Sequence, residues 1–166
     1  LSIELPPGHS SSPPNENVID ILSQAVHRLH QNPMPSHFSG STEDIFKSLQ
    51  FGFMLPIRFF MTNLWLLSPL LNKILSSNPL TATILRTTTA LTTVNSGVKV
   101  NVIPGVATAT INHRIHPYDS VQSVLEWDKK ILNDPRIKMK VLEQLEPAPV
   151  TPCDSIPFKT ITKAIF

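Results

Sequence analysis

Residues 106–132, VATATINHRIHPYDSVQSVLEWDKKIL, contain the pattern that decides the fold. Side chains in 106–116 alternate between two kinds, as they do along a β-strand whose two faces meet different surroundings. Pro117 ends this strand, and Asp119 or Ser120 can cap the helix that follows. The apolar positions of that helix recur at helical spacing up to residue 132. The stretch therefore predicts a strand that leads directly into an amphipathic helix.

The two faces of the predicted strand carry different side chains. One face is expected to hold Ala109, Ile111, His113 and Ile115, and the other Thr110, Asn112, Arg114 and His116. His113 and His116 would then point away from each other, so they are not expected to bind a common ligand.

The rest of the chain supplies the other elements of a sandwich. Residues 1–5 alternate as a strand, 16–31 have the spacing of an amphipathic helix, 81–94 are rich in Thr and β-branched residues, and 137–145 alternate again. The order β-α-β-β-α-β predicts the α+β class and a split βαββαβ (ferredoxin-like) two-layer sandwich. We expect a four-stranded antiparallel sheet with two helices on one face, in a domain that covers 1–150.

An apolar insertion interrupts this order between the first helix and the second strand, at about 36–80. Its segment 51–71 is close to the ~20 residues of a membrane span, but Pro56, Arg58, Asn63 and Pro69 break it up. A helical insertion that packs on the sandwich is therefore favoured, and no membrane span is expected. The dense Phe, Leu and Met residues of 46–67 have two readings, a channel for a long acyl chain or internal packing.

Composition excludes several classes of protein. The net charge is +2 without a basic run, and the expected central strands carry no Phe, Tyr or Trp, which argues against nucleic-acid binding. Cys153 is the only cysteine and has no positioned base nearby, so we treat it as inert.

The sequence contains no recognisable metal or nucleophile motif. His-x-Asp, His-Glu-x-x-His, adjacent glutamates and Gly-x-Ser-x-Gly are all absent. His27 and His30 are three residues apart, but they fall on the flank of the predicted helix and are not expected to be ligands. We predict no metal site in this chain and no catalysis by the chain alone.

Three positions nevertheless have the features of functional residues. His9 stands in a stiff proline-fenced loop, Asn101 precedes Val-Ile-Pro, and Arg114 lies within a strand of small, apolar and polar residues. A strand arginine can bind a carboxylate through two hydrogen bonds. Spacing alone leaves an ordinary role open for each of them, as a surface histidine, a turn asparagine and a solvent-facing arginine.

The motifs around these residues carry a family resemblance. Gly8-His9-Ser10-Ser11, Asn101-Val102-Ile103-Pro104 and Asn112-His113-Arg114-Ile115-His116-Pro117 occur in an order that resembles the lid, or dimerisation, domain of di-zinc exopeptidases of the aminoacylase and carboxypeptidase S superfamily. The match runs from about residue 1 to 150. Insertion motifs such as Asn32-Pro33-Met34-Pro35 and Arg86-Thr87-Thr88-Thr89-Ala90 look like the secreted N-fatty-acyl-amino-acid synthase/hydrolase branch.

The resemblance implies a role for each of the three residues. His9 would stabilise the oxyanion formed when water attacks an amide carbonyl, so it is the expected catalytic residue. Asn101 and Arg114 would bind the substrate's carboxylate or the tetrahedral intermediate. Two zinc ions and a glutamate base would lie outside this chain, in the protein's own catalytic domain, which 151–166 would begin to re-enter.

The resemblance also implies the biological setting. The substrate would be an N-acyl amino acid or a peptide, the protein would form a homodimer, and its location would be secreted, extracellular or vacuolar. Both ends of the sequence fall within apparent elements, so we expect a fragment of a longer enzyme. Two other readings stay open: a non-catalytic dimerisation module, and a stand-alone sandwich that binds a small ligand.

Overall fold

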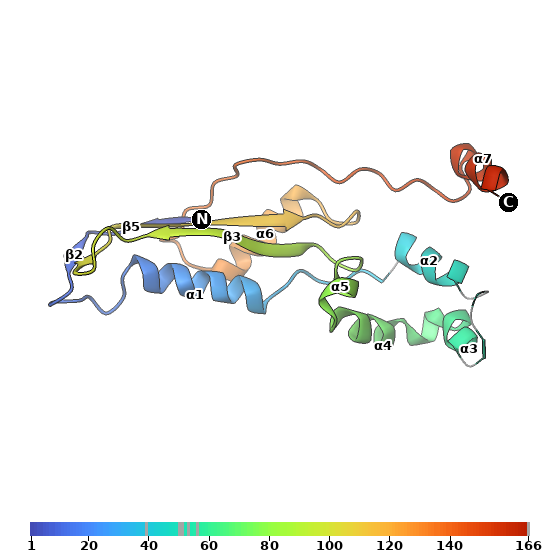
Figure 1. Ribbon diagram of the computed structural model, residues 1–166, viewed down its shortest axis with the longest axis horizontal. Helices are drawn as coiled ribbons and strands as arrows, with labels where there is room; N and C mark the ends of the chain where they lie inside the picture. Colours follow the sequence, from blue (N-terminus) through green and yellow to red (C-terminus); the bar gives the residue numbers. More distant parts are fainter. Residues whose placement is uncertain (39, 50–51, 53, 56, 166) are drawn as a thin grey trace.

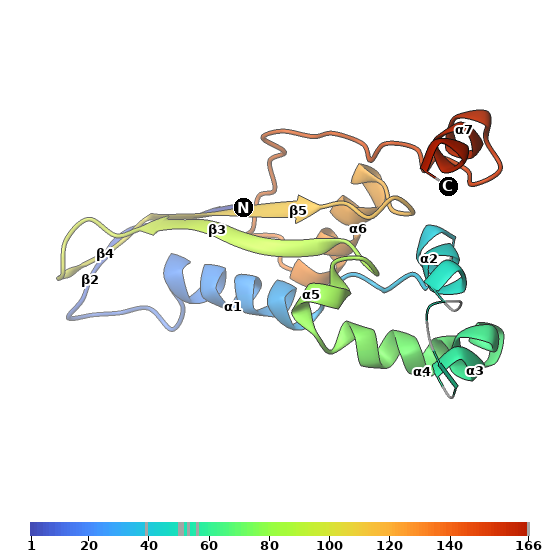
Figure 2. The same ribbon diagram turned by 45° about the vertical axis from the view of Figure 1, so that its right-hand side comes forward.

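The computed structural model describes residues 1–38, 40–49, 52, 54–55 and 57–165 (Figure 1). Within these ranges only the backbone is described for Ser41, Ser48, Leu49, Phe60, Met61 and Trp65. The chain forms a sheet with helices on one face, a helical insertion beyond one end of that sheet, and an extended tail (Figure 2). The mixture of helices and antiparallel strands confirms the α+β class.

The main sheet has three antiparallel strands in the order β1-β5-β3. They are β1 (Ser2–Glu4), β5 (Val106–Arg114) and β3 (Thr88–Ser96). The long β3–β5 ladder runs from the pair Ser96–Ala107 to the pair Thr88–Arg114. Two further short strands, β2 (Gly8–His9) and β4 (Val102–Ile103), pair separately in a projecting arm beyond the sheet's other end.

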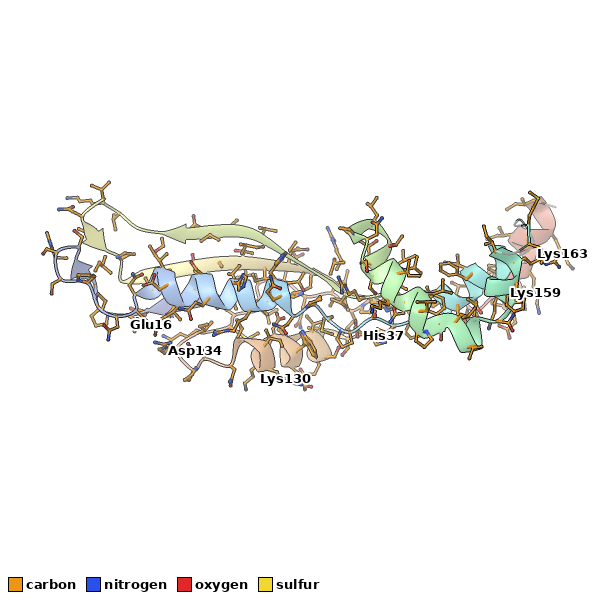
Figure 3. The ribbon with its side chains drawn as sticks, turned by 90° about the horizontal axis from the view of Figure 1, so that it is seen from below. Glu16, His37, Lys130, Asp134, Lys159 and Lys163 are labelled. Carbon is orange, nitrogen blue, oxygen red and sulfur yellow. The ribbon has the colours of Figure 1, made fainter. Side chains whose placement is uncertain are left out.

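Two helices cover one face of this sheet, and Figure 3 shows them side by side from below. They are α1 (Val18–Gln31), capped by Asn17, and α6 (Val121–Leu132), capped by Ser120. Each cap side chain accepts a hydrogen bond from the N3 backbone N–H, and each N3 side chain accepts one from the cap backbone N–H. The first backbone donors of both helices therefore have partners. The core between helices and sheet consists of Ile3, Val18, Ile21, Leu22, Ala25, Leu29, Ala107, Ala109, Leu132 and Ile137.

The insertion is helical, as predicted, but its helices lie mainly beyond the end of the sandwich and not on its face, where they were expected to pack. It contains α2 (Ser41–Leu49), α3 (Ile57–Thr62), α4 (Leu64–Ser76) and α5 (Pro79–Ala82). In both Figure 1 and Figure 2 these helices extend past the end of the sheet at which β3 begins and β5 ends.

None of the helices in the described part of the chain combines the length and the apolar character needed to cross a bilayer.

The strand expected at 81–94 begins later than its composition indicates. Asn78 accepts a hydrogen bond from the Leu80 N–H, and Pro79 occupies the first helical position, so a short helix forms at Pro79–Ala82. The chain then turns, and the strand starts only at Thr88. Helix capping therefore overrides the high β-propensity of the first half of that segment.

The fourth strand expected at 137–145 is reduced to one bridge. Ser2 and Lys138 exchange two backbone hydrogen bonds of 2.9 and 2.8 Å, and no strand follows in the described tail. The partner strand β1 has only three residues, so it offers little backbone for a longer ladder. The complete ferredoxin-like sheet is therefore not confirmed. The extended tail ends in a further helix, α7 (Ile156–Ile165).

Candidate functional site

The predicted residues His9 and Asn101 lie together on the projecting arm. In the β2–β4 pair His9 is opposite Val102 and Gly8 is opposite Ile103. The Ser10 N–H donates to the Asn101 carbonyl at 3.2 Å, which places Asn101 next to the histidine loop. Both side chains are exposed. The arm therefore carries an exposed imidazole and an exposed carboxamide on neighbouring segments of backbone.

The hydrogen bonds of the loop determine which nitrogen of the His9 ring carries the proton. The Ser11 N–H donates to His9 Nδ1 at 3.3 Å, and the Ser11 hydroxyl lies 2.8 Å from the same nitrogen. A neutral imidazole whose Nδ1 accepts a hydrogen bond carries its proton on Nε2. His9 Nε2–H is thus a donor, as an oxyanion contact requires.

At the base of the arm, the backbones of Leu5 and Gly105 approach each other closely. Leu5 N–H donates to the Gly105 carbonyl at 2.9 Å, and a Cβ on Gly105 would lie 3.0 Å from the Leu5 carbonyl oxygen. A side chain here would crowd the Leu5 carbonyl unless the backbone shifted slightly, so a glycine suits this crossing. Beside it is a mostly apolar pocket of about 240 Å³ lined in part by Pro6, Pro14 and Pro104. The prolines restrict how far the arm can bend, since each fixes its own φ angle.

Arg114 lies at the opposite end of the sheet. It is exposed, it is the last residue of β5, and it pairs with Thr88. The arm joins the other end of β5, three residues after Ile103. A nine-residue strand spans roughly 26 Å from its first to its last Cα. The structure therefore brings His9 and Asn101 together but holds Arg114 far from both.

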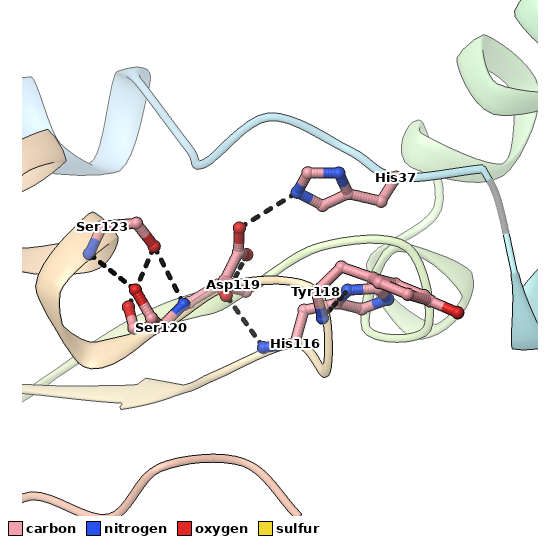
Figure 4. A network of polar contacts seen from close by, with 7 residues as sticks. His37, His116, Tyr118, Asp119, Ser120 and Ser123 are labelled. Carbon is pink, nitrogen blue, oxygen red and sulfur yellow. Dashed lines mark hydrogen bonds and ion pairs between the residues drawn. The ribbon is translucent and has the colours of Figure 1, made fainter. Parts of the chain in front are cut away.

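A polar cluster that the sequence did not predict lies just beyond Arg114 (Figure 4). The Asp119 carboxylate accepts a hydrogen bond from the Thr87 hydroxyl at 2.5 Å and contacts His37 Nε2 at 3.0 Å. The His116 backbone N–H donates to the Thr87 hydroxyl oxygen at 2.9 Å. We call His37, Thr87, His116 and Asp119 the strand-end cluster.

The position of His116 corrects the expected alternation of faces. The strand ends at Arg114, and the following turn carries the His116 side chain inward, where it is 6% exposed. Its ring stacks on His37, with centroids 5.4 Å apart, and contacts Tyr118. Pro117 was the signal, because a proline that ends a strand also ends the two-residue period by which faces are assigned.

The His116 side chain is held in its neutral form. Burial lowers the pKa of His116 below its ordinary value, and the neighbouring His37 lowers it further. A hydrogen bond with the Ile84 backbone and the charge of Asp119 oppose this shift. The Tyr118 N–H donates to His116 Nδ1 at 3.3 Å, consistent with a neutral ring protonated on Nε2.

A second histidine–aspartate pair lies on the helix-facing side of β5. His113 Nε2 contacts Asp128 of α6 at 2.9 Å, and Thr89 contacts His113 Nδ1 at 3.2 Å. The Asp128 side chain is 7% exposed and the His113 side chain 15%. His113 and His116 thus belong to separate clusters, as their predicted separation implied.

No group of three or more His, Cys, Asp or Glu side chains in the described residues is arranged to hold a metal ion. The zinc pair that the resemblance implies therefore does not fit the described part of this chain.

Fold and arm together define a two-layer sandwich domain whose arm offers polar groups outward. Residues 2–140 match the family described as the peptidase dimerisation domain, and the chain belongs to that family. This confirms the resemblance to the lid, or dimerisation, domain of the aminoacylase and carboxypeptidase S superfamily.

The names of similar proteins agree with this family. The N-fatty-acyl-amino acid synthase/hydrolases of Mus musculus and Homo sapiens are each 48% identical over 155 residues, which is 93% of this chain and 31% of theirs. The probable carboxypeptidase S-like 2 of Dictyostelium discoideum is 41% identical over 166 residues, 99% of this chain and 32% of that protein. The chain thus spans about a third of the length of these relatives.

Proposed function

We propose that the chain is the lid and dimerisation domain of an amide hydrolase or synthase that acts on N-acyl amino acids or peptides. The family match and the relatives' names support this class of activity. The observation that carries the proposal is the separation of the three site residues, with His9 and Asn101 at one end of the sheet and Arg114 at the other.

This separation requires two copies of the domain for one reaction. In an N-acyl amino acid the carboxylate and the scissile amide are attached to the same carbon, so one substrate cannot reach both ends of the sheet. A homodimer with twofold symmetry resolves the conflict, because the arm of one subunit then lies against the active site served by Arg114 of the other.

The chain offers a surface for such a dimer. β3 is an edge strand of the main sheet, and its residues from Ala90 to Ser96 are exposed. An exposed edge has unpaired backbone donors and acceptors that can join a second strand. Pairing of two β3 edges, with α1 alongside, is the symmetric interface we propose.

Each residue has a distinct part in the chemistry. The Arg114 guanidinium binds the substrate carboxylate through two parallel hydrogen bonds and so fixes the position of the amide. His9 of the opposite subunit donates its Nε2–H to the oxygen that gains negative charge, and the Asn101 amide donates beside it. The two zinc ions, held by residues outside this chain, would supply activation of the attacking water.

Mixed dimers of the full-length protein test the proposal. We would purify heterodimers of a His9→Ala chain and an Arg114→Ala chain, each with its own affinity tag. One of the two sites then has an intact His9 from one chain and an intact Arg114 from the other, so about half of the wild-type activity should return. Each homodimer should be inactive.

The outcome separates shared from unshared sites. If His9 and Arg114 serve the same site from one subunit, both sites of the heterodimer are defective and no activity returns. Such a result, with normal zinc content and a dimeric mass, would contradict a site shared between subunits. Full activity in both homodimers would instead favour the non-catalytic dimerisation module.

A further inference from the structure

The strand-end cluster lies at both sides of the rung that carries Arg114. Thr87 directly precedes Thr88, which pairs with Arg114, and His116 follows Arg114 by two residues. The Thr87 hydroxyl accepts the His116 N–H and donates to Asp119, so one side chain ties the two strand ends together beyond their last pair.

Asp119 is the centre of this cluster. One carboxylate oxygen contacts Thr87 and the other contacts His37, and the side chain is only 6% exposed. Thr87 is fully buried. A buried carboxylate is costly without partners, so removal of any member leaves a polar group unsatisfied and allows the two strand ends to move apart.

The same cluster connects Arg114 to the start of the insertion. His37 leads toward α2, and its backbone N–H donates to the Leu85 carbonyl at 2.6 Å. Gly40, with a φ of 55°, passes so close to the Tyr118 ring that a Cβ there would collide with the phenol. Thr42 of α2 donates its hydroxyl to the Ile84 carbonyl at 3.1 Å. The start of the insertion is therefore docked both on the segment that precedes β3 and on the turn after Arg114.

The pair His113–Asp128 provides a comparison within the same molecule. It has the same chemistry and an aspartate buried to a similar degree, 7% exposed against 6% for Asp119, and its histidine is the residue next to Arg114. It joins β5 to α6 under the sheet, however, and is not bonded to the Arg114–Thr88 rung. Variants of the two pairs can therefore distinguish an effect on the stability of the fold from an effect on the position of Arg114.

We propose that Asp119 is a positioning residue for substrate carboxylate recognition. Through Thr87 and the β5–α6 turn it fixes the rung from which the Arg114 guanidinium extends, and through His37 it fixes the insertion against that rung. The inference rests on the proposed function, in which Arg114 binds the carboxylate. Asp119 itself does not touch the substrate.

The test is a ratio measured on the full-length enzyme. We would measure kcat/KM for an N-acyl amino acid and for its C-terminal carboxamide, which lacks the negative charge. Asp119→Ala should lower the ratio of the two values about 10-fold, since a misdirected guanidinium weakens only the charged substrate. Arg114→Ala should lower the ratio further.

Matched variants separate positioning from loss of stability. Asp128→Ala should reduce the melting temperature without changing the ratio. Thr87→Val should lower the ratio, and Thr87→Ser, which keeps the hydroxyl, should restore it. The Thr87 pair also replaces Asp119→Ala if that variant does not fold.

Two results would overturn the inference about Asp119, and a third would contradict the proposed function itself. An unchanged ratio in Asp119→Ala and Thr87→Val, together with a lowered ratio in Arg114→Ala, removes the positioning role alone. An equal fall in Asp128→Ala assigns the effect to general destabilisation. An unchanged ratio in Arg114→Ala shows instead that Arg114 does not bind the carboxylate.

Discussion

The sandwich and the insertion differ in how far their largest apolar side chains are buried. In the sandwich Ile3, Ile21 and Leu22 are 1–2% exposed. In the described part of the insertion Met54, Leu55 and Leu80 are 84, 78 and 81% exposed. A soluble domain rarely leaves so much apolar surface in one place without a partner. The sandwich is therefore stabilised by burial of its own apolar side chains, whereas the apolar surface of the insertion is suited to contact another part of the protein or a ligand.

The largest expected effect concerns the chemistry carried by the sandwich. His9→Ala in the full-length enzyme should lower kcat by about 10²–10³, as loss of one oxyanion donor does. Zinc content, measured by elemental analysis, should not change because the proposed function places the zinc ligands outside this chain. Zinc lost together with activity would make His9 a metal ligand instead.

Stability measurements compare the two regions directly. Ile21→Ala opens a cavity in the core and should lower the free energy of unfolding by about 2–5 kcal/mol. Leu80→Ala, on the exposed insertion surface, should change it by less than about 0.5 kcal/mol. Urea denaturation followed by circular dichroism measures both. Equal losses would mean that the insertion contributes to the core as much as the sandwich does.

Substrate chain length tests what the insertion contacts. Phe59 is 60% exposed on α3. If the insertion binds the acyl chain, Phe59→Ala should reduce kcat/KM about 10-fold for a long-chain N-acyl amino acid and much less for a short-chain one. Equal losses would favour packing against the rest of the protein. The same prediction holds for Trp65, whose side chain lies outside the described residues.

The smallest expected effect is on the pH dependence of stability that comes from His116, which lies where the sandwich meets the insertion. The folded pKa of His116 lies below its unfolded value near 6.5, so the unfolded chain binds more protons as the pH falls. The stability from neutral His116 is therefore present above pH 6.5 and is lost as the pH falls through the lower folded pKa. The melting temperature of the His116→Asn variant should therefore fall less between pH 7 and pH 5 than that of the unmodified protein. An identical fall in both proteins would assign the pH dependence to other groups.

The sequence predicted elements whose signals are local. The helix 16–31 has a clear apolar stripe, and α1 is found at Val18–Gln31. The strand 106–116 was predicted from alternation and is β5 up to Arg114. The edges were less accurate, since the segment before Thr88 became a capped helix and the strand after Ile137 became a single bridge. Those outcomes depend on caps and on partner length, which composition does not show.

Site residues were predictable only where their motifs are contiguous. The three motifs gave His9, Asn101 and Arg114, but their placement at two ends of the sheet depends on strand pairing. The strand-end cluster was missed because its members lie up to 82 positions apart, as His37 and Asp119 do. None of the four has a neighbouring residue that indicates a partner so distant in the chain.

The distance between the arm and Arg114 has a consequence for evolutionary analysis. In the proposed dimer, arm residues press against a neighbouring subunit and against substrate held there, so mutations at the two ends of one chain constrain each other. Correlated changes between positions near 9 or 101 and positions near 114 should therefore appear across related sequences. Covariation of this kind would report contacts between subunits. If it were interpreted as contacts within one chain, it would wrongly place the arm next to Arg114 of the same subunit.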